Sequence, residues 1–225
     1  MKKILGILLA ALLAVPAFSQ ESADLTLLSS EDGRFSLDVF SHFGWGYGFV
    51  KSDDFTPKGS GEVFVNVLKL KVFPVQSLGF ELGADLGWRY VGSKESAFIQ
   101  RDHVVHAVDF STIFRADHSR STVSTFSINV PLLLKFKAGD CSIGAGAEAQ
   151  FNLTGETSYY YRDEDTRVDA TTSKAKVNTF TYGFVGTIGY NDFSVFAKFY
   201  PKNVRFLPEG SVDFNLWTLG VAYGF

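Results

Sequence analysis

The chain has 225 residues, a formal net charge of −3 at pH 7 and a single cysteine, Cys141. This length suits one domain, the mild acidity gives no basis for binding nucleic acid, and a lone cysteine cannot form a disulfide bond within the chain. Hydrophobic residues make up 46% of the sequence and aromatic residues 16%. Both a soluble β-sandwich and a membrane protein can have this composition, so the order of the residues must distinguish them.

Residues 1–19 have the three parts of a secretory signal peptide. Two lysines precede the apolar run Ile4–Val15, and small residues follow it near Ser19. The run is shorter than the ~20 apolar residues that a helix needs to span a bilayer. We therefore predict cleavage after Ser19, a short periplasmic lead-in over residues 20–33 and one β-barrel domain over residues 34–225.

Most of the remaining chain alternates with a period of two residues. Along Leu78–Tyr90, large apolar residues alternate with glycine and charged residues, which places the two kinds on opposite faces of a β-strand. Segments of about 10 to 15 residues are long enough to cross a bilayer as tilted strands. Such segments are Phe35–Phe49, Glu62–Phe73, Leu78–Tyr90, Thr125–Phe136, Ser142–Leu153, Thr179–Tyr190, Phe193–Tyr200 and Trp217–Phe225.

The alternation slips once, within Glu62–Phe73. The large apolar residues stand at odd positions at first, as Val63 and Val65 do, and then at even positions, as Leu68 and Leu70 do. A slip of one residue exchanges the two faces of a strand. We therefore expect either a β-bulge or an edge that extends into the periplasm.

Short and long connections alternate along the chain. The short links are Pro74–Ser77, Lys137–Asp140 and Asn191–Asp192, and the long ones are Lys51–Gly61, Val91–Arg120, Thr154–Lys176 and about 204–212. Eight antiparallel strands with both chain ends on one side require three short turns, which face the periplasm, and four long outer loops. The sequence thus predicts an all-β, eight-stranded antiparallel up-and-down transmembrane β-barrel in the outer membrane of a Gram-negative bacterium, surrounded by outer-membrane lipid.

The C-terminal segment Trp217–Phe225 has large residues on one face, small residues on the other, and an aromatic last residue. Outer-membrane barrels typically end in this way, and the barrel-assembly machinery reads the terminal aromatic residue. We therefore predict that Tyr223 and Phe225 form a C-terminal assembly signal.

Charged residues also fall on the small face of the predicted strands. An eight-stranded barrel is only wide enough for side chains to fill it, and an isolated buried charge is unfavourable. We therefore expect a salt-bridged plug that closes the lumen, with a proton or ion path as the alternative. The residues concerned are Asp38, His42, Glu81, Asp85, Arg89, Lys135, Glu148 and Lys198.

The two longest predicted loops contain aromatic residues and arginine, which suit contact with an extracellular or periplasmic protein or glycan. Alternatively, the tyrosines extend a strand and its aromatic girdle above the membrane. The candidate contact residues are Phe110, Phe114, Tyr159, Tyr160, Tyr161 and Arg162.

Two groups in the loops bear on chemistry. His103 and His106 would share a metal ion only on a helical turn and with a further ligand. The triplet Asp117–Ser119 contains Asp, His and Ser, but nothing in the sequence fixes its geometry. We therefore predict no catalytic residue, no cofactor and no metal ion.

The segment Ser127–Phe136, with the sequence SINVPLLLKF, resembles the (I/L)P(L/V)LLK(Y/F) strand of the PorT-like outer-membrane β-barrel family of Bacteroidota. The strand Ile143–Glu148 and the terminal Leu219–Phe225 also fit this family. The resemblance implies a single small barrel with diverse or unassigned roles. A few members support type IX secretion, but no motif here carries that role over, and the family supplies no catalytic residues.

Three functions remain open from the sequence. The leading one is a non-enzymatic structural or interaction protein that acts through its long extracellular loops. The second is a narrow conduit for small or hydrophobic molecules, through a lateral opening or a loosened lumen. The third is a lipid-modifying outer-membrane enzyme.

Overall fold

The computed structural model describes residues 26–30, 34–114, 118–163, 166–172, 174–201 and 206–224. The predicted signal peptide, most of the predicted lead-in and Phe225 lie outside these residues. The strands are β1 (Thr26–Ser29), β2 (Phe35–Val39), β3 (His42–Lys51), β4 (Ser60–Val75), β5 (Leu78–Ser93), β6 (Ser96–Arg101), β7 (Val104–Asp109), β8 (His118–Ala138), β9 (Cys141–Asp163), β10 (Thr166–Thr172), β11 (Phe180–Tyr190), β12 (Phe193–Tyr200) and β13 (Asn215–Gly224); the helix is α2 (Phe110–Phe114).

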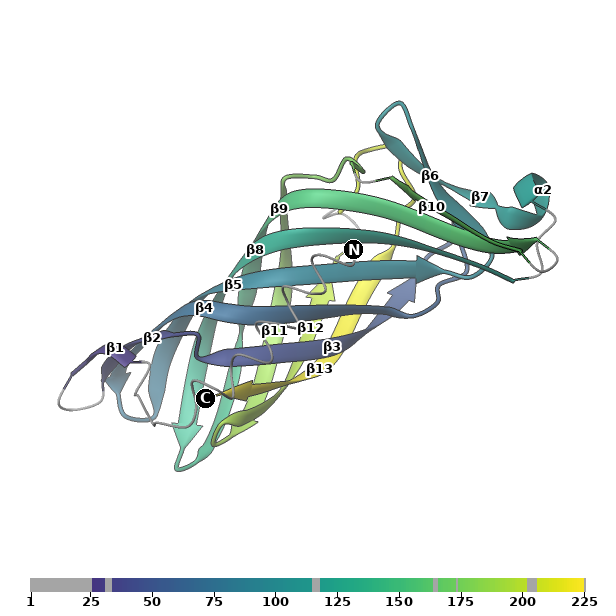
Figure 1. Ribbon diagram of the computed structural model, residues 1–225. Coiled ribbons are helices and arrows are strands. Elements are labelled where there is room, and N and C mark those ends of the chain that lie inside the picture. Colours follow the sequence, from purple (N-terminus) through teal and green to yellow (C-terminus); the bar gives the residue numbers. More distant parts are fainter. Residues whose placement is uncertain are drawn as a thin grey trace.

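Eight of these strands close into a ring, which confirms the predicted eight-stranded up-and-down barrel (Figure 1). The ring runs β3–β4–β5–β8–β9–β11–β12–β13, and β13 pairs with β3 to close it. Three tight turns join β4 to β5, β8 to β9 and β11 to β12. Gly139 and Asn191 in two of these turns have φ values of 60° and 51°, which glycine and asparagine tolerate well. We call this end of the barrel the turn end and the opposite one the loop end.

The predicted slip in alternation is a β-bulge. The register between β4 and β5 shifts between Asn66 and Leu68. The facing strand breaks at the same level, where Phe40 has a φ of 48° and donates its backbone N–H to the carbonyl of Val67 (3.2 Å). The segment predicted as one strand, Phe35–Phe49, is therefore divided into β2 and β3, and both halves pair with β4.

The division of this strand changes the barrel wall at the turn end. Above the break, β3 lies between β4 and β13. Below it, β2 pairs with β4 on one edge and with β1 on the other. The last described pair of β13 is Gly224 with His42. Within the described part of the chain, β13 thus pairs with β3 as far as His42 and does not pair with β2.

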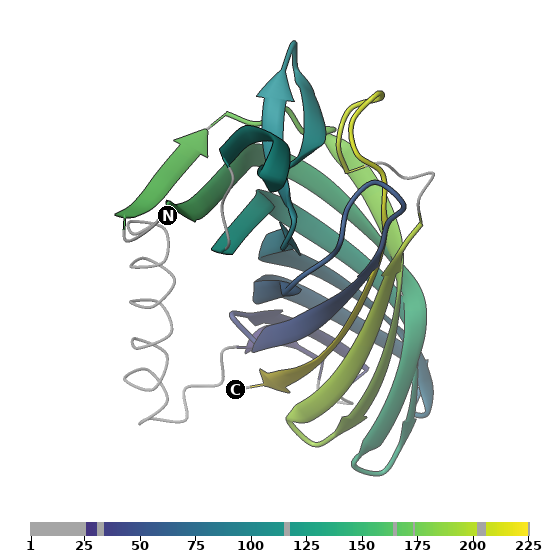
Figure 2. The ribbon, with the colours of Figure 1, turned by 90° about the vertical axis from the view of Figure 1, so that its right-hand side faces the viewer.

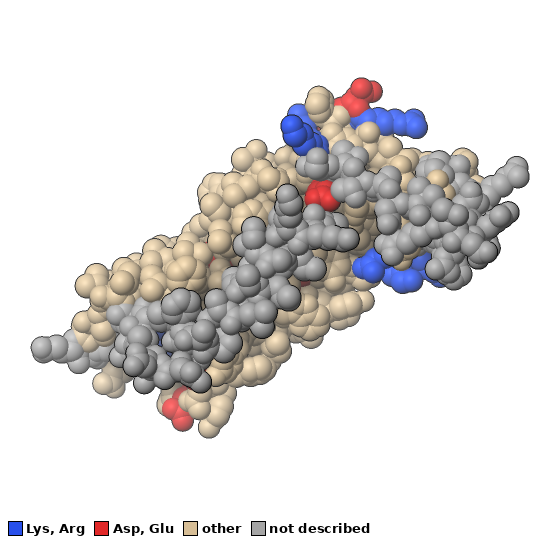
Figure 3. All heavy atoms as spheres, in the orientation of Figure 1, with Lys and Arg blue, Asp and Glu red and all other residues tan. Residues whose placement is uncertain are grey.

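The outer surface of the ring is apolar. In β13, Trp217 and Leu219 are exposed, whereas Leu216 and Thr218, which alternate with them, are buried. The charged side chains visible in Figure 3 lie mainly towards the two ends of the molecule. Aromatic rings gather near the loop end, where Phe199 stacks on Trp217 with ring centroids 4.1 Å apart. An apolar band with aromatic residues at its rim matches a lipid environment.

The loop end contains more regular structure than the sequence predicted. Strands β5, β8 and β9 continue beyond the ring, β10 pairs with β9, and β6 and β7 form a separate hairpin. The predicted long connections Val91–Arg120 and Thr154–Lys176 lie at this end, and polar residues in them form backbone ladders over much of their length. Among the described residues, no helix has the length and apolar content to cross a bilayer.

An apolar cluster, the outer cap, fills the space beneath these segments. In Figure 2 the teal β6–β7 hairpin and the yellow segment before β13 rise at the same end of the barrel, and Val212 N–H donates to the Val105 carbonyl between them (2.9 Å). Phe98 is fully buried and its ring meets that of Phe55 at 5.0 Å. The outer cap consists of Phe55, Val91, Phe98, Val105, Val123, Tyr200, Phe206, Leu207, Val212 and Leu216.

Candidate functional site

The lumen contains a compact ionic group near its middle, which we call the central charge cluster. Lys198 Nζ lies 2.9 Å from Glu62 Oε1 and 2.8 Å from Glu148 Oε2. These residues come from β12, β4 and β9, so the ion pairs cross the lumen. The cluster consists of Glu62, Arg89, Glu148, Gln150, Lys198 and Tyr200.

The other members complete the cluster around the two carboxylates. The Tyr200 hydroxyl lies 3.0 Å from an oxygen of Glu62 and 3.0 Å from an oxygen of Glu148. Gln150 Nε2 donates to Glu148 Oε1 at 2.6 Å. Arg89 Nε lies 3.6 Å from Glu62 Oε2, and its guanidinium lies 3.7 Å above the Tyr200 ring.

All members of the central charge cluster are almost completely buried. The exposed fractions are 1% for Glu148, 3% for Lys198, 4% for Glu62 and 5% for Arg89. Two cations and two anions make the cluster formally neutral, which offsets the cost of removing these charges from water. Side chains therefore fill the lumen at this level, and the outer cap lies beyond them.

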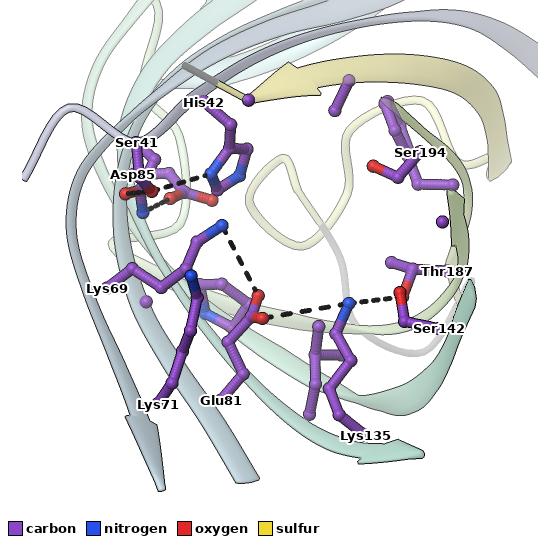
Figure 4. Close-up of a pocket in the computed structure, with 18 of the residues that line it drawn as sticks. Ser41, His42, Lys69, Lys71, Glu81, Asp85, Lys135, Ser142, Thr187 and Ser194 are labelled. Atoms are coloured by element: carbon purple, nitrogen blue, oxygen red, sulfur yellow. Dashed lines mark hydrogen bonds and ion pairs between the residues drawn. The ribbon is translucent and has the colours of Figure 1, made fainter. Parts of the chain in front are cut away.

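Below the cluster, the lumen opens into a cavity of about 530 Å³, which we call the turn-end cavity. It reaches the turn end, where the exposed Asn191 and Asp192 line it. Figure 4 looks into this cavity and shows Lys69 and Lys71 across the open space from Thr187 and Ser194, with Lys135 hydrogen bonded to Thr187. Of the predicted lumen residues, all except Arg89 line it: Asp38, His42, Glu81, Asp85, Lys135, Glu148 and Lys198.

The ion pairs of Glu81 in this cavity are longer than those of Lys198 in the cluster. Glu81 lies between Lys69 and Lys135, at 3.9 Å and 3.8 Å from their ammonium nitrogens. Both separations exceed hydrogen-bond length. Lys135 also hydrogen bonds to the Thr187 hydroxyl at 3.0 Å. A closer pair joins Lys71 to Asp38 (2.6 Å).

A Ser–His contact also lies in the cavity wall. Ser41 Oγ is 3.3 Å from His42 Nδ1, but it donates its proton to Asn66 Oδ1 at 2.7 Å. The same Asn66 side chain donates to Asp85 Oδ1 at 2.7 Å. Because the Ser41 proton points at an amide oxygen, His42 does not act as a base toward this serine.

The structure places the predicted loop contact residues in different surroundings. Phe110 is only 2% exposed and its ring packs 6.4 Å from that of Tyr159. Its prediction as a contact residue is therefore wrong, because α2 turns this side chain inward. Tyr159, Tyr160 and Tyr161 are partly buried and lie within β9, paired with β8 and β10, so they extend a strand. The side chains of Phe114 and Arg162 lie outside the described residues.

The predicted assembly signal is described in part. Tyr223 is 55% exposed on the outer face of β13 and pairs with Phe43 and Phe193. Phe225 lies outside the described residues.

Three charged and three uncharged members of the lumen were missed by the sequence predictions although the alternation places them on the inner face. Val63 and Val65 face outward, and Glu62 has the opposite parity, so it points inward. Past the bulge the parity reverses, which turns Lys69 and Lys71 inward as well. Asn66, Gln150 and Tyr200 carry no charge and were not picked out for that reason.

The loop histidines do not share a helical turn. His103 lies in the β6–β7 turn with a φ of 68°, and His106 lies on β7, exposed. In the part of the chain that the structure describes, no three His, Cys, Asp or Glu side chains are grouped to hold a metal ion. Asp117 and the side chains of His118 and Ser119 lie outside the described residues.

Comparison with known proteins gives one family match. The model of the family "Outer membrane protein beta-barrel domain" matches residues 60–219. No curated protein matches the sequence.

Several solved structures resemble the chain at low identity. The attachment invasion locus protein Ail of Yersinia pestis matches with 13% identity over 85% of this chain and 97% of that one, with a TM-score of 0.35. Its complex with the heparin analogue sucrose octasulfate matches with 15% identity over 85% and 97%, with a TM-score of 0.38. The N-terminal β-barrel domain of Pseudomonas aeruginosa OprF matches with 10% identity over 83% and 98%, with a TM-score of 0.31.

Proposed function

This chain belongs to the outer membrane protein β-barrel domain family, and we propose that it is a non-enzymatic interaction protein with a closed lumen. Its loop end contacts an extracellular protein or glycan. Short turns of outer-membrane barrels face the periplasm, so the turn-end cavity opens to that side. We further propose that the chain is one of the PorT-like barrels of Bacteroidota, with a signal peptide over residues 1–19 and a C-terminal signal for the barrel-assembly machinery.

The observation that carries this proposal is the packed loop end. The β6–β7 hairpin stands on the outer cap through the buried Phe98 and Val105. Its tip exposes Arg101, Asp102 and His103. A surface that is ordered before binding loses less conformational entropy on contact than a mobile loop does. The hairpin therefore presents a preformed site, with charged and imidazole groups suited to a polar partner.

The closed lumen argues in the same direction. The central charge cluster fills the middle of the barrel, and the outer cap covers the side beyond it. An eight-stranded ring leaves no continuous aqueous path once its interior side chains are packed. Function therefore falls to the surfaces at the two ends.

Binding to the loop end is tested by displaying the full chain on cells and measuring adhesion to arrays of proteins and glycans. A second chain has Ser96–Asp109 replaced by a short Gly–Ser turn, and a third carries Arg89→Ala in the lumen. We expect adhesion that is lost with the hairpin and kept with Arg89→Ala. Adhesion that survives removal of the hairpin would contradict the proposal.

The conduit remains the second candidate because the turn-end cavity occupies part of the lumen. Single-channel recording of the refolded mature protein in a planar bilayer separates the two functions. The closed lumen predicts no stepwise conductance. Steady conductance whose ion selectivity changes in Glu62→Gln or Glu148→Gln would favour the conduit instead.

A further inference from the structure

The turn-end cavity gathers more cations near its mouth than the neighbouring carboxylates balance. Lys69, Lys71 and Lys135 all line it, and the acids paired with them are Asp38 and Glu81. Three ammonium groups thus share two carboxylates. A fourth lysine, Lys137, lines the same region with its ammonium nitrogen 4.1 Å above the Phe73 ring rather than on a carboxylate.

The remaining acidic residues of the cavity do not neutralise the extra positive charge of these lysines, because each of them lies elsewhere. Asp85 accepts a hydrogen bond from Asn66 beside His42. Glu148 binds Lys198 in the central charge cluster. Asp192 is exposed in the β11–β12 turn at the mouth. A further anion among the three lysines would therefore meet Lys69 and Lys135, whose ion pairs with Glu81 are longer than a hydrogen bond, beside Lys71, which is paired with Asp38.

The wall opposite Lys69 and Lys71 offers neutral polar groups. Ser142, Thr187 and Ser194 line the cavity there, and Figure 4 shows them across the open space from Lys69. The hydroxyl of Thr187 already meets Lys135. A ligand that bridges the two walls would carry a charged group on one side and hydroxyl groups on the other.

We propose that the turn-end cavity binds a phosphate-bearing molecule that enters from the periplasmic side. Its phosphate lies among Lys69, Lys71 and Lys135, and its hydroxyl groups face Ser142 and Ser194. A phosphate brings several acceptor oxygens and up to two negative charges, which suits three separate ammonium donors better than a single carboxylate does. The cavity of about 530 Å³ is within the size range of small-molecule sites. This binding does not depend on any contact at the loop end.

The phosphate has two possible sources, a soluble metabolite or a lipid headgroup. A soluble molecule enters past the turns. A headgroup enters from the side, where the described ladder of β13 ends at Gly224 and β2 pairs with β1 instead. Lys71 and Asp38 join β4 to β2 beside this place, so a headgroup arriving there would meet Lys71 first.

Binding is measured with the refolded mature chain in maltoside micelles. Glycerol 3-phosphate is titrated calorimetrically, with glycerol as the probe that lacks phosphate. Native mass spectrometry then compares retention of phosphatidylglycerol with retention of diacylglycerol. The variant Lys69→Gln/Lys135→Gln removes two cavity charges, and Lys51→Gln/Lys58→Gln removes two exposed charges at the loop end.

We expect the cavity variant to weaken binding of the phosphate probe by roughly tenfold or more, as loss of hydrogen bonds to charged groups does. The loop-end variant should bind as the parent does. Glycerol 3-phosphate binding with this dependence identifies a soluble ligand, and phosphatidylglycerol retention alone identifies a lipid headgroup.

A third variant protects the test against loss of folding. Ser194→Phe keeps every lysine but fills the cavity from the opposite wall, and it should also abolish binding. Heat-modified mobility on gels verifies that each variant is folded. The proposal is overturned if neither probe binds, if all variants bind equally, or if folded Ser194→Phe retains binding.

Discussion

The two halves of the lumen use the same kinds of residues, but the residue that bridges two opposite charges, Lys198 in one half and Glu81 in the other, is paired at different distances. In the central charge cluster, Lys198 is within 2.9 Å of both of its carboxylates and only 3% exposed. In the turn-end cavity, Glu81 is 3.8 Å and 3.9 Å from its two lysines, beside an open volume of about 530 Å³. The comparison separates the buried ion pairs of Lys198 from the longer ion pairs of Glu81, whose lysines we propose bind a ligand.

The difference has a geometric origin in the strands. Phe64 and Phe196 point into the lumen at the upper boundary of the cavity, and their rings meet at 5.3 Å. Lys198 Nζ lies 4.4 Å above the Phe64 ring, so aromatic surface supports it from below. Glycine and serine line much of the cavity beneath the rings, and such small side chains leave its space unfilled.

The largest effect is expected from Lys198→Ala. This change leaves Glu62 and Glu148 buried with only Arg89 to balance them. Breaking a buried ion pair in this way typically costs about 3–5 kcal/mol. Urea unfolding in neutral vesicles, followed by tryptophan fluorescence, measures the loss. Lys69→Ala in the cavity is the control, and an equally large loss there would remove the distinction between the two halves.

A smaller loss is expected from Arg89→Ala. Glu62 keeps Lys198 as its partner in this variant, so only the 3.6 Å ion pair and the stack on Tyr200 disappear. The free energy of unfolding should fall by about 2 kcal/mol. The same urea titration and a thermal scan measure it. Unchanged resistance to both would show that the cluster does not stabilise the barrel.

Packing near the cluster can be compared with packing in the cavity through two glycines. A Cβ at Gly220 would meet the backbone carbonyl of Trp45, which cannot move aside, whereas one at Gly144 would meet only side-chain atoms, those of the flexible Lys135 at 2.7 Å and Thr187 Oγ1 at 2.8 Å. Gly220→Ala should cost about 1–3 kcal/mol by overpacking. Gly144→Ala should change stability by less than about 0.5 kcal/mol. Equal losses in urea midpoint would mean that the two levels are packed alike.

The smallest effect on stability is expected from Lys135→Gln. Its contact with Glu81 is longer than a hydrogen bond, and its one hydrogen bond given by the structure is to the neutral Thr187 hydroxyl. The free energy of unfolding should stay within about 0.5 kcal/mol of the parent value. A clear loss of stability in the urea titration would mean that Lys135 holds the wall together and is not reserved for a ligand.

Much of the barrel follows from local alternation. The three short turns, the eight strands of the ring and the slip past Val65 are all visible as a period of two and its interruption. Faces are also predictable, since the eight charged residues assigned to the lumen all point inward or line the cavity. Glu62 and Lys69 both point inward although they have opposite parity, because the bulge between them reverses the faces.

The loop end was less predictable for a physical reason. The polar extensions of β8 and β9 lie beyond the ring and do not face lipid. Their sequences therefore lack the alternation of apolar and polar residues that marks the ring strands. Phe110 and the tyrosines of β9 show the consequence. Their exposure depends on how α2 and the hairpin fold over the sheet, and that packing involves residues far apart in the chain.

The sequence by itself determined the class of the protein, because alternation of side chains is a local property and lipid demands it along every strand. Only the tertiary structure decided which charges meet. Glu62, Glu148 and Lys198 lie on strands far apart in the sequence, and their pairing depends on the stagger around the closed ring. The same stagger decides at which level of the lumen the close ion pairs end, and so where the turn-end cavity begins.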